Sequence, residues 1–237
     1  VAFVLPSAPG LPAEPVLRAV AAGFYQGSST AGLRKSELER SAPVELTLLG
    51  ANVDAELQQG LSRAEIEGRA ANLARELVNL PPDELYPESF AERARESADR
   101  TGLHADILDE HRLALERMHA LLAVARGSDR PPRLIVLRHG DATRPPDIAL
   151  VGKGVTFDSG GLSLKSTEHM VDMKCDMAGA ATVLAAMQAI AELRLPANVV
   201  GIMALVENMP SGKAMKLGDV LSTRKGKTIE VLNTDAE

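Results

Sequence analysis

Residues 148–165 read IALVGKGVTFDSGGLSLK, an apolar run that passes into a glycine-rich segment carrying two lysines and one aspartate. The run Ile148–Val151 has no alternating polar residues, which predicts a strand buried on both faces. The glycines that follow allow the backbone to approach a neighbour closely. Since open α/β sheets bind ligands at the carboxyl ends of their strands, we expect Lys153, Asp158 and Lys165 to lie at such an edge.

Strands and helices alternate on both sides of this stretch. Further strands are predicted over residues 103–108, 134–137, 199–206, 217–221 and 228–232, and helices over residues 87–100, 112–124 and 177–195. A helix over residues 62–80 precedes them, with Ser62 and Glu65 as a predicted capping box. This alternation indicates an α/β fold with a mixed, mostly parallel sheet flanked by helices.

Residues 1–60 are patterned more weakly, with a predicted helix over residues 12–25 and a strand over residues 44–49. About fifty residues rarely bury enough surface to fold alone, so this segment is interpreted as the C-terminal part of an N-terminal α/β domain. Residues 61–80 then form a linking helix, and residues 81–237 a second domain. Since the chain has no initiator methionine and stops at residue 237, we expect it to be an internal piece of a longer protein.

Composition and charge exclude several classes of function. The chain has 237 residues with 26 basic and 32 acidic side chains, and this negative balance provides no basic surface for nucleic acid. Aromatic residues make up 3% and tryptophan is absent, which argues against base stacking. No apolar stretch reaches about 18 residues, so no membrane span is predicted. The single cysteine, Cys175, cannot form an internal disulfide, which favours a reducing, cytoplasmic compartment.

Acidic residues recur downstream in positions that suit a metal site. Asp176 precedes the predicted Ala-rich helix, and the chain ends Asn-Thr-Asp-Ala-Glu. Asp235 and Glu237 are two residues apart, so an extended backbone directs both carboxylates to one side. If these segments meet Asp158, four carboxylates share a small space. Their mutual repulsion would be unfavourable unless cations neutralise the negative charges. We therefore predict a site for one or more divalent metal ions.

Three segments, Val151–Lys165, Asp176 and Asn233–Glu237, resemble in sequence and order the motifs of the leucyl aminopeptidases, the M17 family of two-metal cytosolic exopeptidases. The resemblance covers residues 62–237, and it implies that residues 81–237 are the first part of the metallo-aminopeptidase catalytic domain, whose C-terminal remainder is absent.

The resemblance also implies roles for individual residues. The metal ligands would be Lys153, Asp158, Asp176, Asp235 and Glu237, with Asp158 and Glu237 touching both ions. Lys165 matches the catalytic lysine of the family, and the pocket for the first side chain of the substrate would be lined by Met173, Asn233 and Ala236.

The activity that the resemblance implies is hydrolysis of unblocked N-terminal residues, leucine-like ones preferred, from peptides. Two divalent ions per subunit are expected, Mn²⁺ first with Zn²⁺ or Mg²⁺ as alternatives, because oxygen ligands with one amine and no His or Cys suit these ions. The family is typically a cytoplasmic homohexamer, and partners other than peptide N-termini, such as membranes or nucleic acid, are not expected. The family's second catalytic residue, an arginine that holds a bicarbonate, falls two positions after Glu237, so this chain alone is expected to be inactive.

Two other functions stay open. The protein could be a non-catalytic family member that acts as a binding or scaffolding protein, although an intact set of five costly ligand positions argues against this. A different two-metal hydrolase could share only the type of site, although the spacing of Lys153, Asp158 and Lys165 argues against that. Taken alone, Asp176 would be an ordinary helix cap, and Ser159 lacks the Gly-x-Ser-x-Gly frame of a serine nucleophile.

Overall fold

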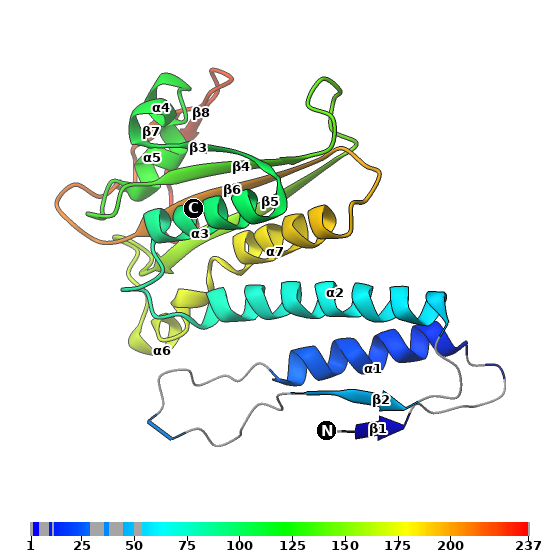
Figure 1. The fold of residues 1–237 in the computed structure, drawn as a ribbon. Helices are drawn as coiled ribbons and strands as arrows, with labels where there is room; N and C mark the ends of the chain where they lie inside the picture. Colours follow the sequence, from blue (N-terminus) through cyan, green and yellow to red (C-terminus); the bar gives the residue numbers. More distant parts are fainter. Residues whose placement is uncertain are drawn as a thin grey trace. The chain divides into compact units, whose positions relative to one another are not determined.

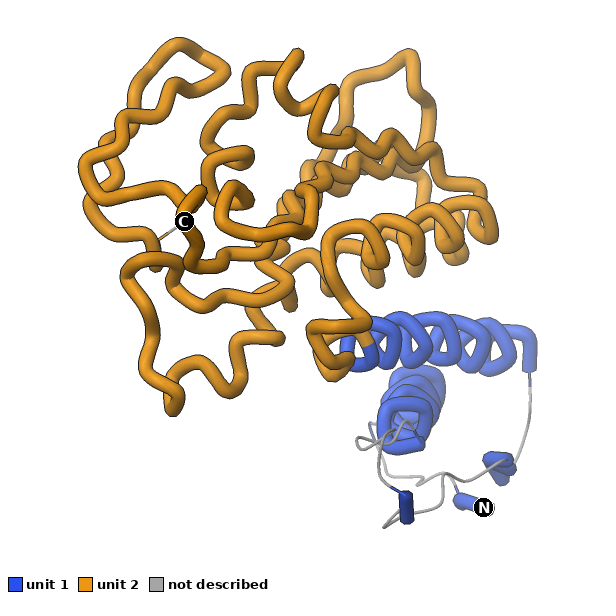
Figure 2. Tube along the Cα trace, turned by 90° about the vertical axis from the view of Figure 1, so that its left-hand side faces the viewer, with its two compact units in different colours: residues 1–76 blue, residues 77–237 orange. Residues whose placement is uncertain are grey.

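The computed structural model describes residues 2–4, 10, 12–28, 36–37, 45–49 and 54–236 of the chain. Glu237, and residue 44 of the strand predicted over residues 44–49, therefore lie outside the described residues. The chain divides into two units, residues 1–76 and residues 77–237, which are blue and orange in Figure 2. None of the described helices is both long and apolar enough to span a membrane.

The described residues of the first unit form two short strands and two helices, the second of which continues to Asn79. β1 (Ala2–Val4) and β2 (Thr47–Leu49) pair in parallel, and α1 (Ala13–Ser28) lies between them in the chain. α2 (Ala55–Asn79) approaches α1 closely at Gly68, where an added Cβ would lie 2.4 Å from the Cβ of Tyr25. The side chain of Asn72 donates to the carbonyl oxygen of Tyr25 at 2.6 Å. The absence of a side chain at Gly68 therefore permits this contact between the two helices.

The start of α2 differs from the prediction. The helix begins at Ala55, and Asp54 caps it by accepting the backbone N–H of Leu57 at 2.9 Å. Ser62 lies inside the helix, where its hydroxyl donates to the carbonyl oxygen of Gln58 at 3.1 Å. The predicted capping box at Ser62 is therefore wrong. The helix was predicted to start too late because its first turns, before Ser62, contain a glycine and two glutamines. They therefore lack the regularly spaced apolar residues from which the rest of the helix was predicted.

A four-stranded mixed sheet forms the centre of residues 77–237 (Figure 1). Its strands, in spatial order, are β3 (His104–Leu108), β4 (Arg133–His139), β6 (Val199–Asn208) and β5 (Ile148–Asp158). β5 and β6 are parallel, whereas β4 is antiparallel to both of its neighbours. The sheet is therefore mixed, as predicted, but it is not mostly parallel, because antiparallel pairs outnumber the parallel pair among these strands. Helices connect β3 to β4 as well as β5 to β6, so the presence of a helix between two strands did not determine their relative direction.

Helices cover both faces of this sheet. α3 (Pro87–Thr101) and α7 (Ala178–Glu192) lie on one face, and the short helices α4 (Glu110–Leu115) and α5 (His119–Ala125) lie on the other (Figure 1). The predicted α/β fold with a mixed sheet flanked by helices is confirmed. The helix predicted over residues 112–124 is instead two helices, because Arg117 adopts a left-handed φ of 59° between them.

The remaining elements are short. α6 (Thr167–Met170) and the 3-10 helix η1 (Met173–Cys175) lie between β5 and α7 in the chain. β7 (Val220–Ser222) and β8 (Thr228–Glu230) form an antiparallel hairpin. β8 lies within the strand predicted over residues 228–232, whereas β7 only overlaps the end of the one predicted over residues 217–221.

β5 is less buried than the prediction for Ile148–Val151 required. It lies at the edge of the sheet, and Val151 is 73% exposed. α5 packs onto β5 only farther along the strand, where Val155 joins Val206 and Ala125 in a buried cluster. The prediction of burial on both faces is therefore wrong for the first half of the strand, because uniform apolarity does not reveal which strand is central in a sheet.

Candidate metal centre

An irregularity in β5 puts Lys153 and Asp158 on the same face of the sheet. The two residues are separated by an odd number of positions, which directs side chains to opposite faces of a regular strand. Lys153 pairs with Ala204 of β6 and Asp158 pairs with Asn208, so β6 advances one residue less than β5 over the same span. The extra residue forms a β-bulge between Val155 and Asp158. The bulge therefore turns Asp158 to the side of Lys153.

Two glycines bring the start of α7 against β5. A Cβ added to Gly152 would lie 2.5 Å from the carbonyl oxygen of Gly179, and one added to Gly179 would lie 2.9 Å from the backbone nitrogen of Lys153. Asp176, which precedes α7, is carried to Lys153 by this contact, and its Oδ2 lies 3.0 Å from Lys153 Nζ. Close backbone packing thus sets the first ion pair of the candidate site.

The substitution Gly152→Ala is expected to destabilise the protein. The added methyl group would overlap the backbone of Gly179, and overpacking of this kind costs about 1–3 kcal/mol. Thermal unfolding measures the effect, and Gly212→Ala is the matched control because nothing lies within 4 Å of a Cβ at that position. Equal melting temperatures for the two variants would refute the close contact between β5 and α7.

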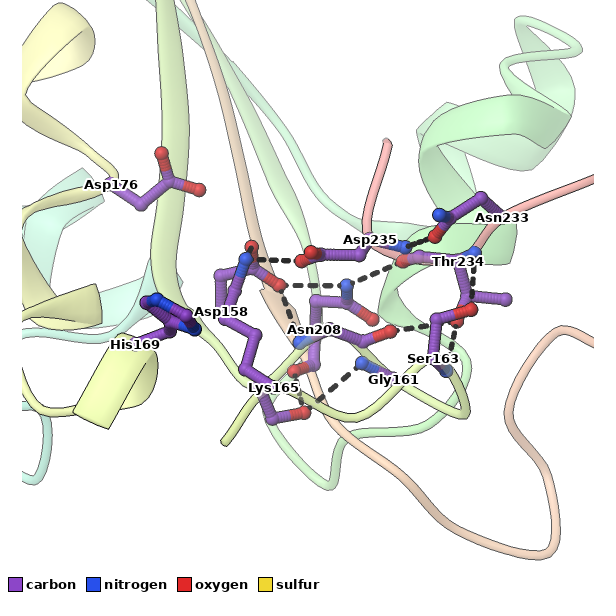
Figure 3. Close-up of polar contacts among 12 residues, drawn as sticks. Asp158, Gly161, Ser163, Lys165, His169, Asp176, Asn208, Asn233, Thr234 and Asp235 are labelled. Carbon is purple, nitrogen blue, oxygen red and sulfur yellow. Dashed lines mark hydrogen bonds and ion pairs between the residues drawn. The ribbon is translucent and has the colours of Figure 1, made fainter. Parts of the chain in front are cut away.

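Lys165 bridges two aspartates at the carboxyl end of β5 (Figure 3). Its Nζ lies 3.0 Å from Oδ2 of Asp158 and also pairs with Oδ1 of Asp235. Asp158 is 2% exposed, whereas Asp235 is only partly buried. Burial acts to lower the pKa of Lys165, but hydrogen bonds and attraction to Asp235 and Asp158 outweigh it and raise the pKa above its ordinary value. Lys165 therefore carries a positive charge at neutral pH.

Hydrogen bonds fix the carboxylate of Asp158. Its Oδ1 accepts the backbone N–H of Gly160 and Nδ2 of Asn208, both at 2.9 Å, and its Oδ2 faces Lys165. Gly160 has a left-handed φ of 84°, and an added Cβ would lie 2.4 Å from the carbonyl oxygen of Ser163. A glycine is therefore needed at this turn. The two oxygens of Asp158 have separate partners, so the orientation of the carboxylate is determined.

Thr234 ties the segment that bears Asp235 to the loop after β5. Its Oγ1 donates to the carbonyl oxygen of Gly160 at 2.7 Å and accepts the backbone N–H of Ser163 at 2.8 Å. Its own backbone N–H donates to the hydroxyl of Ser163 at 3.2 Å. Thr234 is fully buried. These bonds hold Asp235 beside Asp158, although the two residues are far apart in the chain (Figure 3).

The candidate metal ligands lie in two groups. Lys153 pairs with Asp176, and Lys165 pairs with Asp158 and Asp235. Within the ranges that the structure describes, which leave out the fifth candidate Glu237, no three His, Cys, Asp or Glu side chains converge closely enough to hold an ion. The side chains of Asp158 and Asp235 nevertheless suit a hard divalent cation. Their donor atoms are oxygens, and the single positive charge of Lys165 leaves one of their two negative charges unbalanced.

The residues predicted to line a substrate pocket are accessible to differing degrees. Asn233 and Ala236 are exposed, and Met173 is half-buried in η1. The side-chain oxygen of Asn233 accepts the backbone N–H of Asp235 at 2.7 Å. Asn233 thus stabilises the local turn, and the roles of these residues toward a substrate stay predictions.

Asn208, Ser163 and Thr234 complete the site but are absent from the sequence-based prediction. Asn208 ends an apolar strand and is 2% exposed. A polar residue at the end of such a strand is the signal that could have identified it, because strand ends are where α/β sheets place their sites. Ser163 and Thr234 lie inside the motifs Val151–Lys165 and Asn233–Glu237, but their residue type did not single them out, since short polar residues are common in any turn.

Comparison with known proteins identifies relatives of this chain. Residues 72–237 match the model of the cytosol aminopeptidase family, catalytic domain. A probable cytosol aminopeptidase of Rhodopirellula baltica is 48% identical over 219 residues, which are 92% of this chain and 42% of the relative. One of Roseiflexus castenholzii is 47% identical over 242 residues, which are 100% of this chain and 49% of the relative. The chain spans about half the length of the curated relatives it matches.

Solved structures are similar over nearly the whole chain. The bottromycin maturation enzyme BotP in complex with Mn superposes with a TM-score of 0.84 at 39% identity, covering 99% of this chain and 50% of that protein. The cytosol aminopeptidase from Coxiella burnetii superposes with a TM-score of 0.85 at 31% identity, covering 99% of this chain and 49% of that protein.

Proposed function

This chain belongs to the cytosol aminopeptidase family, and on that premise we propose that the protein is a two-metal aminopeptidase. Its substrates are peptides with an unblocked N-terminal residue, leucine-like residues being preferred. The observation that carries the proposal is the arrangement at the carboxyl end of β5, where Asp158 and Asp235 converge on the charged Lys165. Neighbouring carboxylates can supply oxygen ligands to a metal ion, and a charged lysine beside them can stabilise a developing oxyanion, which supports a metal-assisted hydrolase.

The proposed metal ligands are Lys153, Asp158, Asp176, Asp235 and Glu237. Oxygen donors favour Mn²⁺, Mg²⁺ or Zn²⁺, and we propose Mn²⁺, since the similar enzyme BotP has been solved with Mn. When bound, the ions supply a water of lowered pKa and polarise the scissile carbonyl. Lys153 must lose its proton to act as a ligand. A nearby dication would favour this loss, because its positive charge repels the ammonium form and binds the neutral amine.

Lys165 is proposed to stabilise the transition state rather than to bind metal. An ammonium group carries a positive charge and three N–H donors, so Lys165 can donate hydrogen bonds to the oxygen on which negative charge develops. The side chain is 14% exposed, so the charge acts where little water screens it. Asp158 and Asp235 hold the ammonium in a fixed place at the carboxyl end of β5.

The proposed partners are peptide N-termini and further copies of the same protein, in a cytoplasmic homohexamer. Met173, Asn233 and Ala236 are proposed to contact the first side chain of the substrate. Asn233 and Ala236 are accessible on the segment that bears Asp235, which supports this assignment. A bicarbonate held by an arginine is proposed as the general base of the complete active site.

Removal and return of metal test the proposed function. Dialysis of the complete protein against a chelator is expected to abolish release of leucine from leucyl-p-nitroanilide, and added Mn²⁺ is expected to restore it, because the activated water and the polarised carbonyl both depend on the ion. The readout is the absorbance of the released p-nitroaniline. N-acetyl-leucyl-p-nitroanilide is the matched control, since its blocked amine should prevent cleavage.

Two outcomes would contradict the proposal. Equal cleavage of the blocked and unblocked substrates would exclude an aminopeptidase. Tight binding of Mn²⁺ without turnover of any unblocked substrate would instead favour a family member that acts as a binding or scaffolding protein.

A further inference from the structure

Asn208 occupies the one position of β6 that lies in register with Asp158. The two residues pair at the carboxyl ends of their parallel strands, directly after the bulge in β5. Asn208 is 2% exposed, so its amide has little access to water and must find partners within the protein. Its backbone oxygen accepts both the N–H of Ser159, at 3.0 Å, and the hydroxyl of Ser159, at 2.7 Å. Asn208 is thus held firmly at the base of the loop that follows β5.

The side chain of Asn208 donates to both acidic segments. Its Nδ2 lies 2.9 Å from Oδ1 of Asp158 and 2.9 Å from the carbonyl oxygen of Thr234 (Figure 3). That carbonyl belongs to the peptide bond that links Thr234 to Asp235. One nitrogen therefore connects the two carboxylates that flank Lys165, one directly and the other through the backbone.

The chemistry of these partners requires an amide at position 208. An ionised carboxylate and a peptide carbonyl can only accept hydrogen bonds, so the group between them must supply two donors. The NH₂ of asparagine does so from a single atom, which also determines the orientation of the amide. Its oxygen faces Gly161, where an added Cβ would lie 2.9 Å away. A side chain at Gly161 would therefore push the amide away from its two acceptors.

We propose that Asn208 is a positioning residue that holds Asp158 and Asp235 at the mutual orientation required to bind a divalent ion. The inference rests on the proposed function. By occupying Oδ1 of Asp158 together with Gly160, Asn208 directs Oδ2 to the place where Lys165 lies. Groups that orient metal ligands in this way typically contribute a factor of about 10–100 to metal affinity.

The test compares Asn208→Ala with Ser97→Ala in the complete protein. Ser97 is also buried, and its hydroxyl donates to Oε1 of Gln188 at 3.1 Å, so it links α3 to α7 and lies outside the two acidic segments. Isothermal titration with Mn²⁺ gives the Kd of each variant, and thermal unfolding without metal gives its stability. We expect both variants to lose stability, but only Asn208→Ala to bind Mn²⁺ more weakly, by about 10–100-fold.

Each outcome decides a different question. An unchanged Kd for Asn208→Ala, with normal binding by the unsubstituted protein, would overturn the role of Asn208 and leave the proposed function standing. An equal weakening in both variants would also overturn it, since the effect would then follow from lost stability. Absence of Mn²⁺ binding by the unsubstituted protein would overturn the proposed function and this inference with it.

A second variant guards against misfolding of Asn208→Ala. The hydroxyl of Asn208→Ser offers a single donor that is one bond shorter than Nδ2, and it leaves a small polar group in place, so this variant is expected to fold and to bind Mn²⁺ more weakly. Full affinity in Asn208→Ser would contradict the need for two donors.

Discussion

Replacing Asp158 with alanine in the complete protein is expected to remove bound metal and to abolish measurable turnover. Asp158 is a proposed ligand to both ions, and among the site carboxylates that the structure describes it is the most deeply buried. Loss of a catalytic ion removes several kcal/mol of charge stabilisation, and about 1.4 kcal/mol corresponds to a factor of ten in rate. We therefore expect kcat/KM to fall by about 10³-fold or more. Elemental analysis of the purified variant measures the metal, and release of leucine measures the turnover.

Asp147→Ala is the matched control for this experiment. Asp147 lies just before β5, at the opposite end from Asp158, and its Oδ2 accepts the backbone N–H of Asn198 at 2.8 Å. Its loss removes a carboxylate and a hydrogen bond beside the same strand, but no metal ligand. The control should keep its metal and its turnover. Two tightly bound ions in Asp158→Ala would show that Asp158 does not bridge them.

Lys165→Ala is expected to lower kcat by about 10²–10³-fold, which is the usual effect of losing one donor to a developing oxyanion. The metal content should stay unchanged, because the proposed role of Lys165 is to stabilise charge and not to bind the ions. Steady-state kinetics and elemental analysis of the same preparation separate the two roles.

Lys227→Ala serves as the control for the loss of a positive charge. Lys227 is exposed, and it lies in the turn between β7 and β8. This variant should match the unsubstituted protein in kcat and in metal content. A Lys165→Ala variant with normal turnover would exclude the ammonium from the mechanism, and one that had lost its metal would point to a structural role.

Local patterns predict much of the fold. The apolar runs of β4 and β6, and the alternation of strands with helices around them, indicate the α/β class because periodicity depends on nearby residues only. The edge position of β5 and the antiparallel pairing of β4 depend on contacts between distant segments. Neither feature can be recognised from the local sequence pattern. The break between α4 and α5 at Arg117 could not be predicted either, since the residue with positive φ is not a glycine and no proline accompanies it.

The candidate site divides in a similar way. Lys153, Asp158 and Lys165 could be proposed from one continuous motif, and Lys165 and Asp158 are indeed in contact. Asn208 could not, because its importance arises from lying in register with Asp158 on another strand. The partner of each acidic residue was also unpredictable, since Asp176 reaches Lys153 only through the contact between Gly152 and Gly179.

The bulge in β5 bears on how this segment can vary during evolution. Because the extra residue between Val155 and Asp158 reverses the parity of the strand, a single-codon insertion or deletion there would turn Asp158 to the opposite face and break its pairing with Asn208. Point substitutions at the intervening positions leave the count unchanged. Homologous proteins should therefore differ by substitutions between the positions of Val155 and Asp158, whereas the number of residues between these positions should stay constant.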